Sequence, residues 1–420
     1  MYYLCVAKIY GMRQLYYFIF FICLLLNANT GVVYATIMTS NASTQFAKPL
    51  SQEAQISLLT CSPSDEDAYK LYGHTAIRLL DKELNIDVVF NYGIFVFSKP
   101  NFLYRFAKGE TDYKLEAVPF QYYLVEYVMR GSEVYEQVLN LLPEEKEALW
   151  QALVLNERPE NKVYRYNFFF DNCATRPIVM IEKNIHGTVK YVPLAEKPTF
   201  RDVINYCTRY QPWVTFGCDL IMGIPTDREM TLKETFFIPA YLKDAVNKAE
   251  IVRGETTTPL VSKINILNKE ILQEEQEPSF ITSPFACFGL LFMVVMLITW
   301  REWQKKTYYK LVDCILFFMA GIAGCIMFFL SFLSVHPGMF PNISLLWLHP
   351  LHFAGVIFFS AKKFNNMAFW YHFINFAAIL IMSAVWIFYP QHFNFAFIPL
   401  IACFGLRSGW ALLRKKNSIG

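Results

Sequence analysis

Apolar residues concentrate at the two ends of this 420-residue chain, whereas the middle mixes apolar and polar positions. After Pro284 the chain has five apolar stretches, each close to the roughly 20 residues that a membrane-spanning helix needs. They cover approximately residues 284–300, 311–334, 344–360, 368–389 and 394–413. The pattern therefore predicts an all-α domain of five transmembrane helices over residues 284–420.

The N-terminal segment has the layout of a secretory signal. Two basic residues precede an apolar run at Leu15–Leu26, and Ala35 supplies a small side chain for cleavage. We expect a signal peptide over residues 1–35, either cleaved after Ala35 or retained as an anchor. A polar linker over residues 36–55 is expected to follow it.

The loops between the apolar stretches indicate an orientation. Residues 301–310, 362–363 and 414–416 are basic, whereas the alternate loops at 335–342 and 389–393 contain no Lys or Arg. Because basic loops stay on the cytoplasmic side, the soluble part of the chain is expected outside the cytoplasm. We therefore predict a multi-pass protein of the bacterial inner membrane with its soluble domain in the periplasm.

Residues 56–254 have the shorter, mixed periodicities of an α+β domain. Runs of β-branched and aromatic residues indicate strands, and apolar positions three or four residues apart indicate helices. Strands are expected at residues 56–60, 75–80, 88–92, 95–106 and 113–118, and helices at 121–130, 143–156 and 174–185. Residues 255–283 are polar and acidic, and we expect them to tether this domain to the first apolar helix.

The composition agrees with this division. Hydrophobic residues make up 55% of the chain and charged residues only 17%. That balance is too apolar for an ordinary soluble protein. The net charge of +3 is too small to indicate a nucleic-acid partner.

Cys173 and His74 are the residues of the exported domain best suited to covalent chemistry. Cys173 follows Asn172 at the expected start of a helix, whose dipole would lower the pKa of the thiol. A thiolate beside an imidazole can carry out covalent acyl transfer. Taken singly, a buried inert cysteine and a strand-edge histidine are the alternatives. Cys207 and Cys218 are close enough in sequence to form a disulfide, although the sequence does not decide the pairing.

Three other polar residues are candidates for supporting roles. A hairpin between the strands at 75–80 and 88–92 would bring Asn91 beside His74, where its amide would fix the tautomer of the imidazole. Arg78 and Arg176 are candidates for contacting a phosphate group. Structural or surface ion pairs are the alternative for both arginines.

Residues 336–352 contain three of the seven histidines of the chain, His336, His349 and His352. The segment can be a polar rim that admits a lipid head group or supports the soluble domain. It can also be an interfacial anchor with helix caps, or a metal site. No Cys or carboxylate accompanies the histidines, and their spacing departs from the standard metal-ligand patterns. We therefore expect no metal and no other cofactor.

The order of these groups resembles that of circularly permuted papain-like enzymes of the NlpC and lecithin retinol acyltransferase type. A His begins one strand, a polar residue lies on the next strand, and an Asn-Cys pair precedes a helix. More specifically, the chain resembles the Lnb N-terminal periplasmic domain family of Bacteroidota, and its helical half resembles the usual partner domain of that family. The matching segments are residues 58–61, 72–78, 90–93, 167–176 and 217–228. For the last of these we expect only packing or substrate fit.

The resemblance implies lipoprotein N-acylation. An acyl chain would pass from a phospholipid to Cys173 as a thioester, and then to the α-amine of the N-terminal diacylglyceryl cysteine of a lipoprotein. Cys173 would be the nucleophile, His74 the base and Asn91 the group that orients the base. Substrate contacts are expected from Tyr92, Arg78, Asn172 and Arg176. The expected partners are a phospholipid donor, a diacylated lipoprotein acceptor and membrane lipids.

Two alternatives to an acyltransferase stay open. A cysteine peptidase or amidase on the same fold would use water in place of the amine. A non-enzymatic receptor or envelope assembly factor would need Cys173 only for its structure. Substitution of Cys173 separates the catalytic functions from the non-catalytic one.

Overall fold

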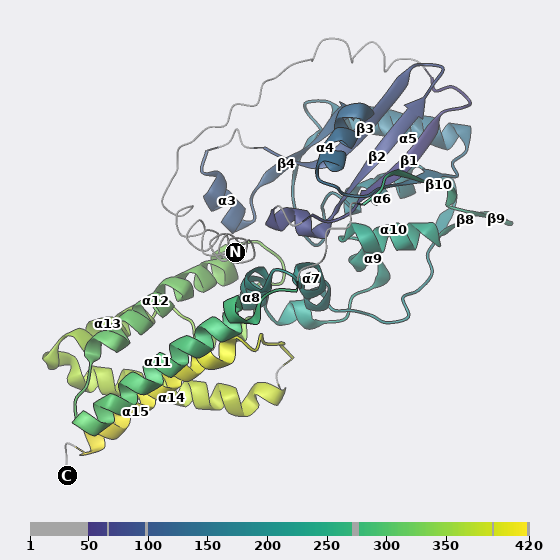
Figure 1. Cartoon of the computed structure of the whole chain (residues 1–420). Coiled ribbons are helices and arrows are strands. Elements are labelled where there is room, and N and C mark those ends of the chain that lie inside the picture. The colour runs from purple at the N-terminus through teal and green to yellow at the C-terminus, as the bar shows by residue number, and fades with distance from the viewer. Residues whose placement is uncertain (1–48, 65–66, 97–99, 271–276, 389, 418–420) are drawn as a thin grey trace, which may run out of the picture.

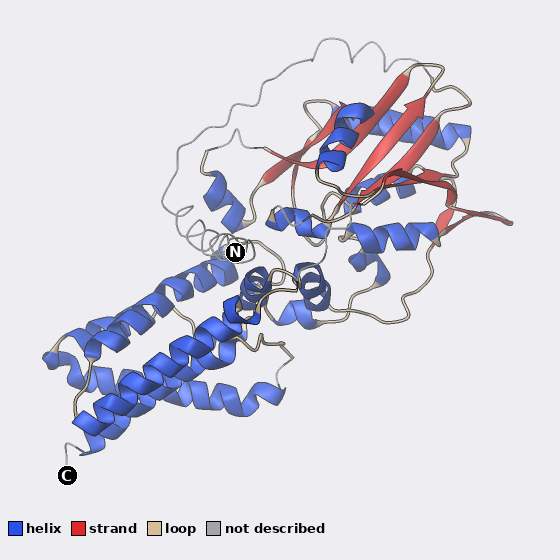
Figure 2. Cartoon of the chain, viewed as in Figure 1, coloured by secondary structure: helices blue, strands red, loops and turns tan. Residues whose placement is uncertain are grey.

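The computed structural model describes residues 49–64, 67–96, 100–270, 277–388 and 390–417. The expected signal peptide at 1–35 and most of the expected linker at 36–55 lie outside these residues. Figure 1 shows a domain that contains a β-sheet and, next to it, a bundle of long helices. The N-terminal part is therefore α+β and the C-terminal part helical, as the sequence predicts (Figure 2).

A seven-stranded sheet forms the centre of the N-terminal domain, and its paired strands are antiparallel. The spatial order is β10-β5-β1-β2-β3-β4-β6. These strands are β1 (Gln55–Cys61), β2 (His74–Asp81), β3 (Ile86–Phe95), β4 (Asp112–Pro119), β5 (Val134–Leu139), β6 (Val163–Arg165) and β10 (Val261–Asn268). A smaller sheet contains β7 (Thr188–Lys190), β8 (Glu250–Arg253) and β9 (Thr256–Pro259).

Helices cover both faces of the large sheet, so its central strands β1 and β2 are buried at nearly every position. Ile56 and Leu58 of β1 belong to the core on one face, and Leu59 and Cys61 belong to the core on the other. The first face is covered by α5 (Pro143–Glu157), α6 (Thr175–Lys183) and α10 (Pro239–Asn247), and the second by α4 (Phe120–Met129).

The remaining helical elements of this domain are short. They are η1 (Ala68–Tyr72), α3 (Phe102–Lys108), α7 (Phe200–Thr208), α8 (Pro212–Ile221), η2 (Ile224–Asp227) and α9 (Leu232–Thr235). Figure 1 shows α3, α7 and α8 on the side of the domain that faces the long helices. These elements therefore connect the sheet to the membrane part of the chain.

Most local predictions for this domain are confirmed, and two are wrong. The strand expected at 95–106 ends at Phe95, and α3 follows, because its aromatic side chains pack toward the long helices instead of joining the sheet. The tether expected at 255–283 begins later, because residues 261–268 form β10 and pair with β5. This edge strand interrupts its apolar residues with Ser262, Lys263, Asn265 and Asn268, so it resembles a linker in sequence.

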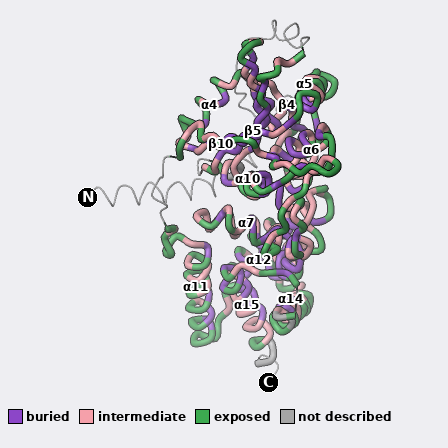
Figure 3. Tube along the Cα trace, turned by 90° about the vertical axis from the view of Figure 1, so that its right-hand side faces the viewer, coloured by how far each residue is buried: buried purple, intermediate pink, exposed green. Residues whose placement is uncertain are grey.

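Four helices in the described part of the C-terminal half are long and apolar enough to cross a membrane. They are α11 (Pro284–Lys305), α12 (Lys310–Phe328) with the π-helical turn η4 (Phe329–Leu333), α14 (Asn365–Val385) and α15 (Phe397–Asn417). Figure 3 shows exposed residues along the outer sides of α11 and α14, as expected for helices that face lipid.

The fifth expected span, residues 344–360, is not one continuous helix. It contains the short turn η5 (Ile343–Leu346) and then α13 (His352–Ser360), which has nine residues. A helix of that length is about 14 Å long, less than half of a hydrocarbon core of about 30 Å. Pro350 lacks the backbone donor that a continuous helix would need here. Helix length therefore does not confirm the expected count of five.

A buried ion cluster joins three of the long helices. The guanidinium of Arg407 on α15 lies 2.7 Å from Glu302 of α11 and 2.6 Å from Asp313 of α12. All three side chains are fully buried, and Arg407 also donates to Thr299 at 3.0 Å. Each of these buried charges is stable only with its partners, because an unpaired charge in an apolar interior is very unfavourable.

We predict that Arg407→Leu destabilises the protein by about 3–5 kcal/mol, because it leaves two carboxylates buried without a cation. Adding Glu302→Gln and Asp313→Asn to that variant should restore much of the loss. The measurement is thermal unfolding of the full chain in detergent. Arg301→Leu, which removes an exposed arginine one position before Glu302, is the matched control. An unchanged midpoint for Arg407→Leu would contradict the assignment.

The two parts of the chain meet at a docking segment, residues 219–227. Its backbone pairs with the loop after η4, where the Gly223 N–H donates to the Gly338 carbonyl at 2.7 Å and the Ile224 N–H to that of Pro341 at 2.9 Å. Side chains of the membrane part contact the same segment: Asn342 donates to Leu220 and Ile221, Gln391 to Met222, and Asn394 to Asp219. The motif at 217–228 thus forms the junction between the two parts.

Arg201 of α7 holds the docking segment in shape. It is 2% exposed, and it pairs with Asp227 at 2.7 Å and Asp219 at 3.1 Å. It also donates to the Met222 carbonyl at 2.8 Å. One buried cation therefore compensates two buried carboxylates and fixes the loop between them.

Gly223 has no room for a side chain, because a Cβ there would lie 2.3 Å from the Pro341 carbonyl oxygen. We predict that Gly223→Ala destabilises the junction by about 1–3 kcal/mol and speeds tryptic cleavage after the exposed Arg228. Gly217→Ala is the control in the same motif, because nothing lies within 4 Å of its Cβ position. Equal cleavage rates in the two variants would show that the junction is not tightly packed.

Candidate active site

His74 and Asn91 come together at one end of the large sheet. His74 begins β2, Asn91 lies on the neighbouring antiparallel strand β3, and His74 Nε2 is 2.6 Å from Asn91 Oδ1. An amide oxygen can only accept, so Nε2 carries the proton and Nδ1 keeps its lone pair. Asn91 therefore holds the imidazole in the tautomer that can act as a base through Nδ1.

Cys173 approaches the same place from the loop before α6. Gly93, with a φ of 95°, makes this approach possible. A Cβ at Gly93 would lie 3.2 Å from Cys173 Cβ and 3.9 Å from His74 Cε1. The predicted triad of Cys173, His74 and Asn91 therefore lies around Gly93, where the backbone conformation and the close approach of Cys173 both require a glycine.

Asn172 fixes the position of the nucleophile candidate. It is 1% exposed, and its amide donates to the carbonyls of Phe168 at 2.9 Å and Phe237 at 2.7 Å. Its Oδ1 accepts from the backbone N–H groups of Ala174 and Thr175 at the start of α6. The structure therefore gives Asn172 a positioning role, in place of the expected contact with substrate.

Both reactive groups are neutral at physiological pH. Burial raises the pKa of the Cys173 thiol to about 11, although the thiol accepts hydrogen bonds from Tyr166 and from the backbone N–H groups of Thr75 and Cys173 itself. Burial lowers the pKa of His74 to about 4, against the opposing effect of its hydrogen bond to Asn91. The expected lowering of the thiol pKa is thus wrong, because desolvation outweighs the dipole of α6.

Aromatic residues that are not among the predicted site residues surround Cys173 and His74. Tyr166 donates its hydroxyl to Cys173, and the ring of Tyr127 stacks on His74 with a centroid distance of 6.4 Å. Tyr123 lies 3.2 Å from the buried Cys61 thiol at the same end of the sheet. The aromatic run before Cys173 was the only sequence signal for Tyr166, and nothing local indicates which of its residues reaches the thiol.

Two family models match this chain. The Lnb N-terminal periplasmic domain matches residues 45–206, and the Lnb transmembrane domain matches residues 275–418. The chain belongs to the Lnb family. No curated protein and no solved structure matches it. The family resemblance is therefore confirmed, and His74, Asn91 and Cys173 all lie in the matched periplasmic domain of this Lnb protein.

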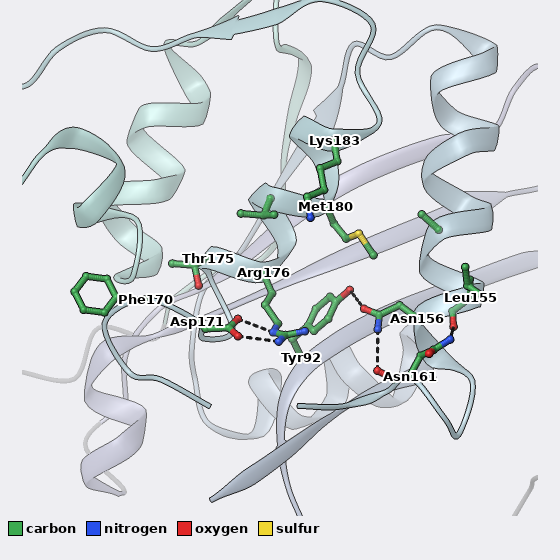
Figure 4. A pocket seen from close by; sticks show the side chains of 12 residues that line it. Tyr92, Leu155, Asn156, Asn161, Phe170, Asp171, Thr175, Arg176, Met180 and Lys183 are labelled. Carbon is green, nitrogen blue, oxygen red and sulfur yellow. Dashed lines mark hydrogen bonds and ion pairs between the residues drawn. The ribbon is translucent and has the colours of Figure 1, made fainter. Parts of the chain in front are cut away.

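Tyr92 and Arg176 line a cavity of about 620 Å³ between α5 and α6 (Figure 4). Tyr92 donates to Asn156 at 2.7 Å, and Arg176 makes two contacts with Asp171 at 2.6 and 2.8 Å. None of the triad lines this cavity. Tyr92 and Arg176, two of the four predicted substrate residues of the Lnb domain, are thus close in sequence to Asn91 and Cys173. They line a different space from the one where Cys173 and His74 meet.

Arg78 lies within the sheet, away from any open surface. It is 7% exposed, pairs with Asp87 at 2.8 Å and Glu136 at 3.0 Å, and stacks on the ring of Phe120. Its guanidinium therefore has the structural role that was the alternative to phosphate contact. This placement corrects the expectation that Arg78 binds substrate.

Cys207, Cys218 and the three histidines of residues 336–352 contribute to packing and to contacts between elements. Cys207 and Cys218 are free thiols, as are all the described cysteines, so the suggested disulfide is absent from the part of the chain that the structure describes. His336 Nε2 contacts the Phe106 carbonyl at 2.8 Å, where the Lnb periplasmic domain meets the helices. His349 and His352 stack within the bundle at 4.1 Å. No cluster of three metal-ligating residues occurs among the described residues.

We predict that alkylation of Cys173 by iodoacetamide is slow at pH 7 and accelerates up to about pH 11. Only the thiolate reacts, and a raised pKa means that it accumulates as the pH rises through that value. Peptide mass spectrometry of the full chain separates Cys173 from the other cysteines. A rate that is already constant below pH 7 would indicate a thiolate–imidazolium pair and contradict the neutral resting state.

Proposed function

We propose that this Lnb protein is a lipoprotein N-acyltransferase with a circularly permuted papain-like catalytic domain. It transfers an acyl chain from a phospholipid, through a thioester on Cys173, to the α-amine of a lipoprotein's N-terminal diacylglyceryl cysteine. The observation that carries the proposal is the 2.6 Å contact of His74 with Asn91 beside Gly93, where Cys173 approaches. Membership in the Lnb family supports the same activity.

The first half-reaction needs only groups that the site holds. As Cys173 Sγ attacks the ester carbonyl, its proton moves to His74 Nδ1 and an S–C bond forms. The C–O bond of the ester then breaks, and the leaving lysophospholipid alkoxide takes the proton from His74. Because thiol and imidazole both begin neutral, proton transfer accompanies attack and does not precede it.

The second half-reaction reverses these roles. The lipoprotein amine attacks the thioester, a C–N bond forms and the C–S bond breaks, while His74 moves the amine proton to the departing sulfur. In both tetrahedral states the oxyanion needs donors. The Cys173 N–H, the Thr75 N–H and the Tyr166 hydroxyl, which already donate to the sulfur, are the candidates.

A membrane-anchored substrate fits the attachment of the site to the helices. Tyr72, two residues before His74, hydrogen-bonds with Cys218 of α8. On the same helix, Phe216 packs on Phe288 of α11 and Phe397 of α15, with both centroid distances 5.2 Å. The base is thus held close to the bundle, where a phospholipid and a lipidated acceptor both reside.

The proposal includes a topology. We infer an inner-membrane protein with the catalytic domain in the periplasm, since the basic loops at 301–310 and 362–363 would then be cytoplasmic. Residues 343–360 would complete the fifth crossing as a broken span. Irregular backbone is tolerated at membrane depth where protein covers it, and here the buried Ser344, Trp347 and Leu348 are packed within the bundle.

The proposed function predicts that a strain whose only copy carries Cys173→Ala makes lipoproteins with diacylated, free N-termini. Cys207→Ala, another free thiol of the same domain, is the control and should leave N-acylation unchanged. Mass spectrometry of lipoprotein N-terminal peptides reads the result. Persistence of triacylated N-termini in the Cys173→Ala strain would contradict the acyltransferase, and normal N-termini with a damaged envelope would favour an assembly factor.

We also predict that Tyr166→Phe lowers kcat by about 10²-fold, the usual effect of losing one oxyanion donor. Tyr164→Phe is the matched control, because the Tyr164 hydroxyl is buried without a hydrogen-bond partner. Steady-state acyl transfer by the purified full chain gives both values. Equal rates for the two variants would exclude Tyr166 from the reaction.

A further inference from the structure

We propose that α3 lies in the outer leaflet of the membrane and guides an acyl chain of a membrane phospholipid to Cys173. This inference rests on the proposed function and adds the route by which the donor reaches the site. It comes from three features: the exposed apolar side chains of α3, their continuity with the end of α12, and a row of aromatic residues between α3 and the nucleophile.

The first feature is that α3 buries none of its residues. Leu103, Tyr104 and Phe106 are 39%, 55% and 46% exposed. Three large apolar side chains on one short helix form a surface that water solvates poorly, and such surfaces mark contact with a partner or a membrane. Arg105 and Lys108 on the same helix give it the mixture of aromatic and basic residues found at membrane interfaces.

The second feature identifies lipid as the occupant. Tyr104 packs on Phe329 of η4 with a centroid distance of 5.9 Å, and the Val335 N–H donates to the Lys108 carbonyl at 2.8 Å. On η4 itself, Phe332 and Leu333 are 51% and 54% exposed, at the end of a helix long and apolar enough to cross a membrane. Figure 1 shows α3 beside the end of α12, so the exposed face of α3 continues the lipid-facing surface.

Packing at Gly109 fixes α3 in this place. Gly109 ends the helix with a φ of 77°, and a Cβ there would lie 3.1 Å from the His336 backbone nitrogen. The His336 ring also contacts the Phe106 carbonyl, at 2.8 Å. The loop between η4 and η5, residues 334–342, therefore holds α3 at a constant depth relative to the long helices.

The third feature is an aromatic wall that begins at the nucleophile. Tyr166 donates to Cys173, and its ring stacks on Tyr113 at 4.0 Å. From Tyr113 the wall continues through Phe95 at 4.6 Å, Phe102 at 5.9 Å and Phe106 at 6.1 Å. Tyr113 is buried and the other four rings are partly exposed, so an unbroken series of ring contacts links the exposed helix α3 to the tyrosine that donates to the thiol.

The first experiment measures the depth of α3 without any reaction. A fluorescent amino acid replaces Leu103 in the full chain, which is reconstituted in phosphatidylcholine–phosphatidylglycerol vesicles containing brominated lipid. We expect strong quenching at position 103 and none at Ile264, an apolar residue on the edge strand β10 that is 49% exposed against 39% for Leu103. Equal, weak quenching at both positions would overturn the inference whatever the activity of the protein.

The second experiment tests the route. Leu103→Glu/Tyr104→Glu should slow transfer from a long-chain phospholipid in vesicles on the order of tenfold, the factor that loss of one buried apolar side chain corresponds to. Transfer from a short-chain phospholipid dissolved as monomers should stay unchanged. Ile264→Glu/Ile266→Glu is the matched control and should affect neither donor.

The outcomes separate the route from the reaction. Equal loss with both donors would mean that α3 only supports the domain, and unchanged rates with both would mean that lipid does not pass it. Either result overturns the inference while leaving the acyltransferase intact. Unmodified protein that acylates no amine with either donor would instead overturn the proposed function, and the quenching measurement would still decide the position of α3.

Discussion

The site of this Lnb protein depends on how one buried arginine fixes the docking segment between the two domains. Arg201 compensates Asp219 and Asp227, and the segment between them presents its backbone carbonyls to Asn342 and Gln391 of the membrane domain. These groups are far apart in sequence, and removing one buried charge would leave the others unpaired. Because the segment begins in the last turn of α8, and Cys218 of that helix contacts Tyr72 just before His74, the same interaction determines where the candidate base lies relative to the helices.

The burial of the catalytic pair has a chemical consequence that links the fold to a lipid substrate. A neutral thiol and a neutral imidazole can be enclosed by Tyr127 and Tyr166 without the solvation that an ion pair would require. Cys173 and His74 are partly exposed, and their aromatic surrounding limits the access of water, which competes with an amine for a thioester. The same surrounding accepts an acyl chain. These properties support the proposed transfer between lipids over the alternative, hydrolysis of a soluble peptide.

Local sequence patterns were enough to predict the strands β1 to β4 and the helices next to them. The order of His74, Asn91 and Cys173 along the chain was enough to select them as the candidate site. These features depend on periodicity and on residue order. Distant partners could not be identified from the sequence: an ion pair was one of the two interpretations of Arg78, but not its pairing with Glu136, 58 positions away, and β10 joins the sheet by pairing with β5. The raised thiol pKa was also missed, because burial is a property of the folded domain and not of the residues around Cys173.

The central claim, that Cys173 carries an acyl group between two membrane lipids, is tested most directly by isolating the covalent intermediate. The purified full chain in phospholipid vesicles, without an acceptor, should gain the mass of one acyl chain, located on Cys173 by peptide mass spectrometry. Adding a diacylated lipopeptide with a free α-amine should remove that mass and yield the N-acylated peptide. Absence of the adduct, or its hydrolysis at a rate that the amine does not change, would contradict the account.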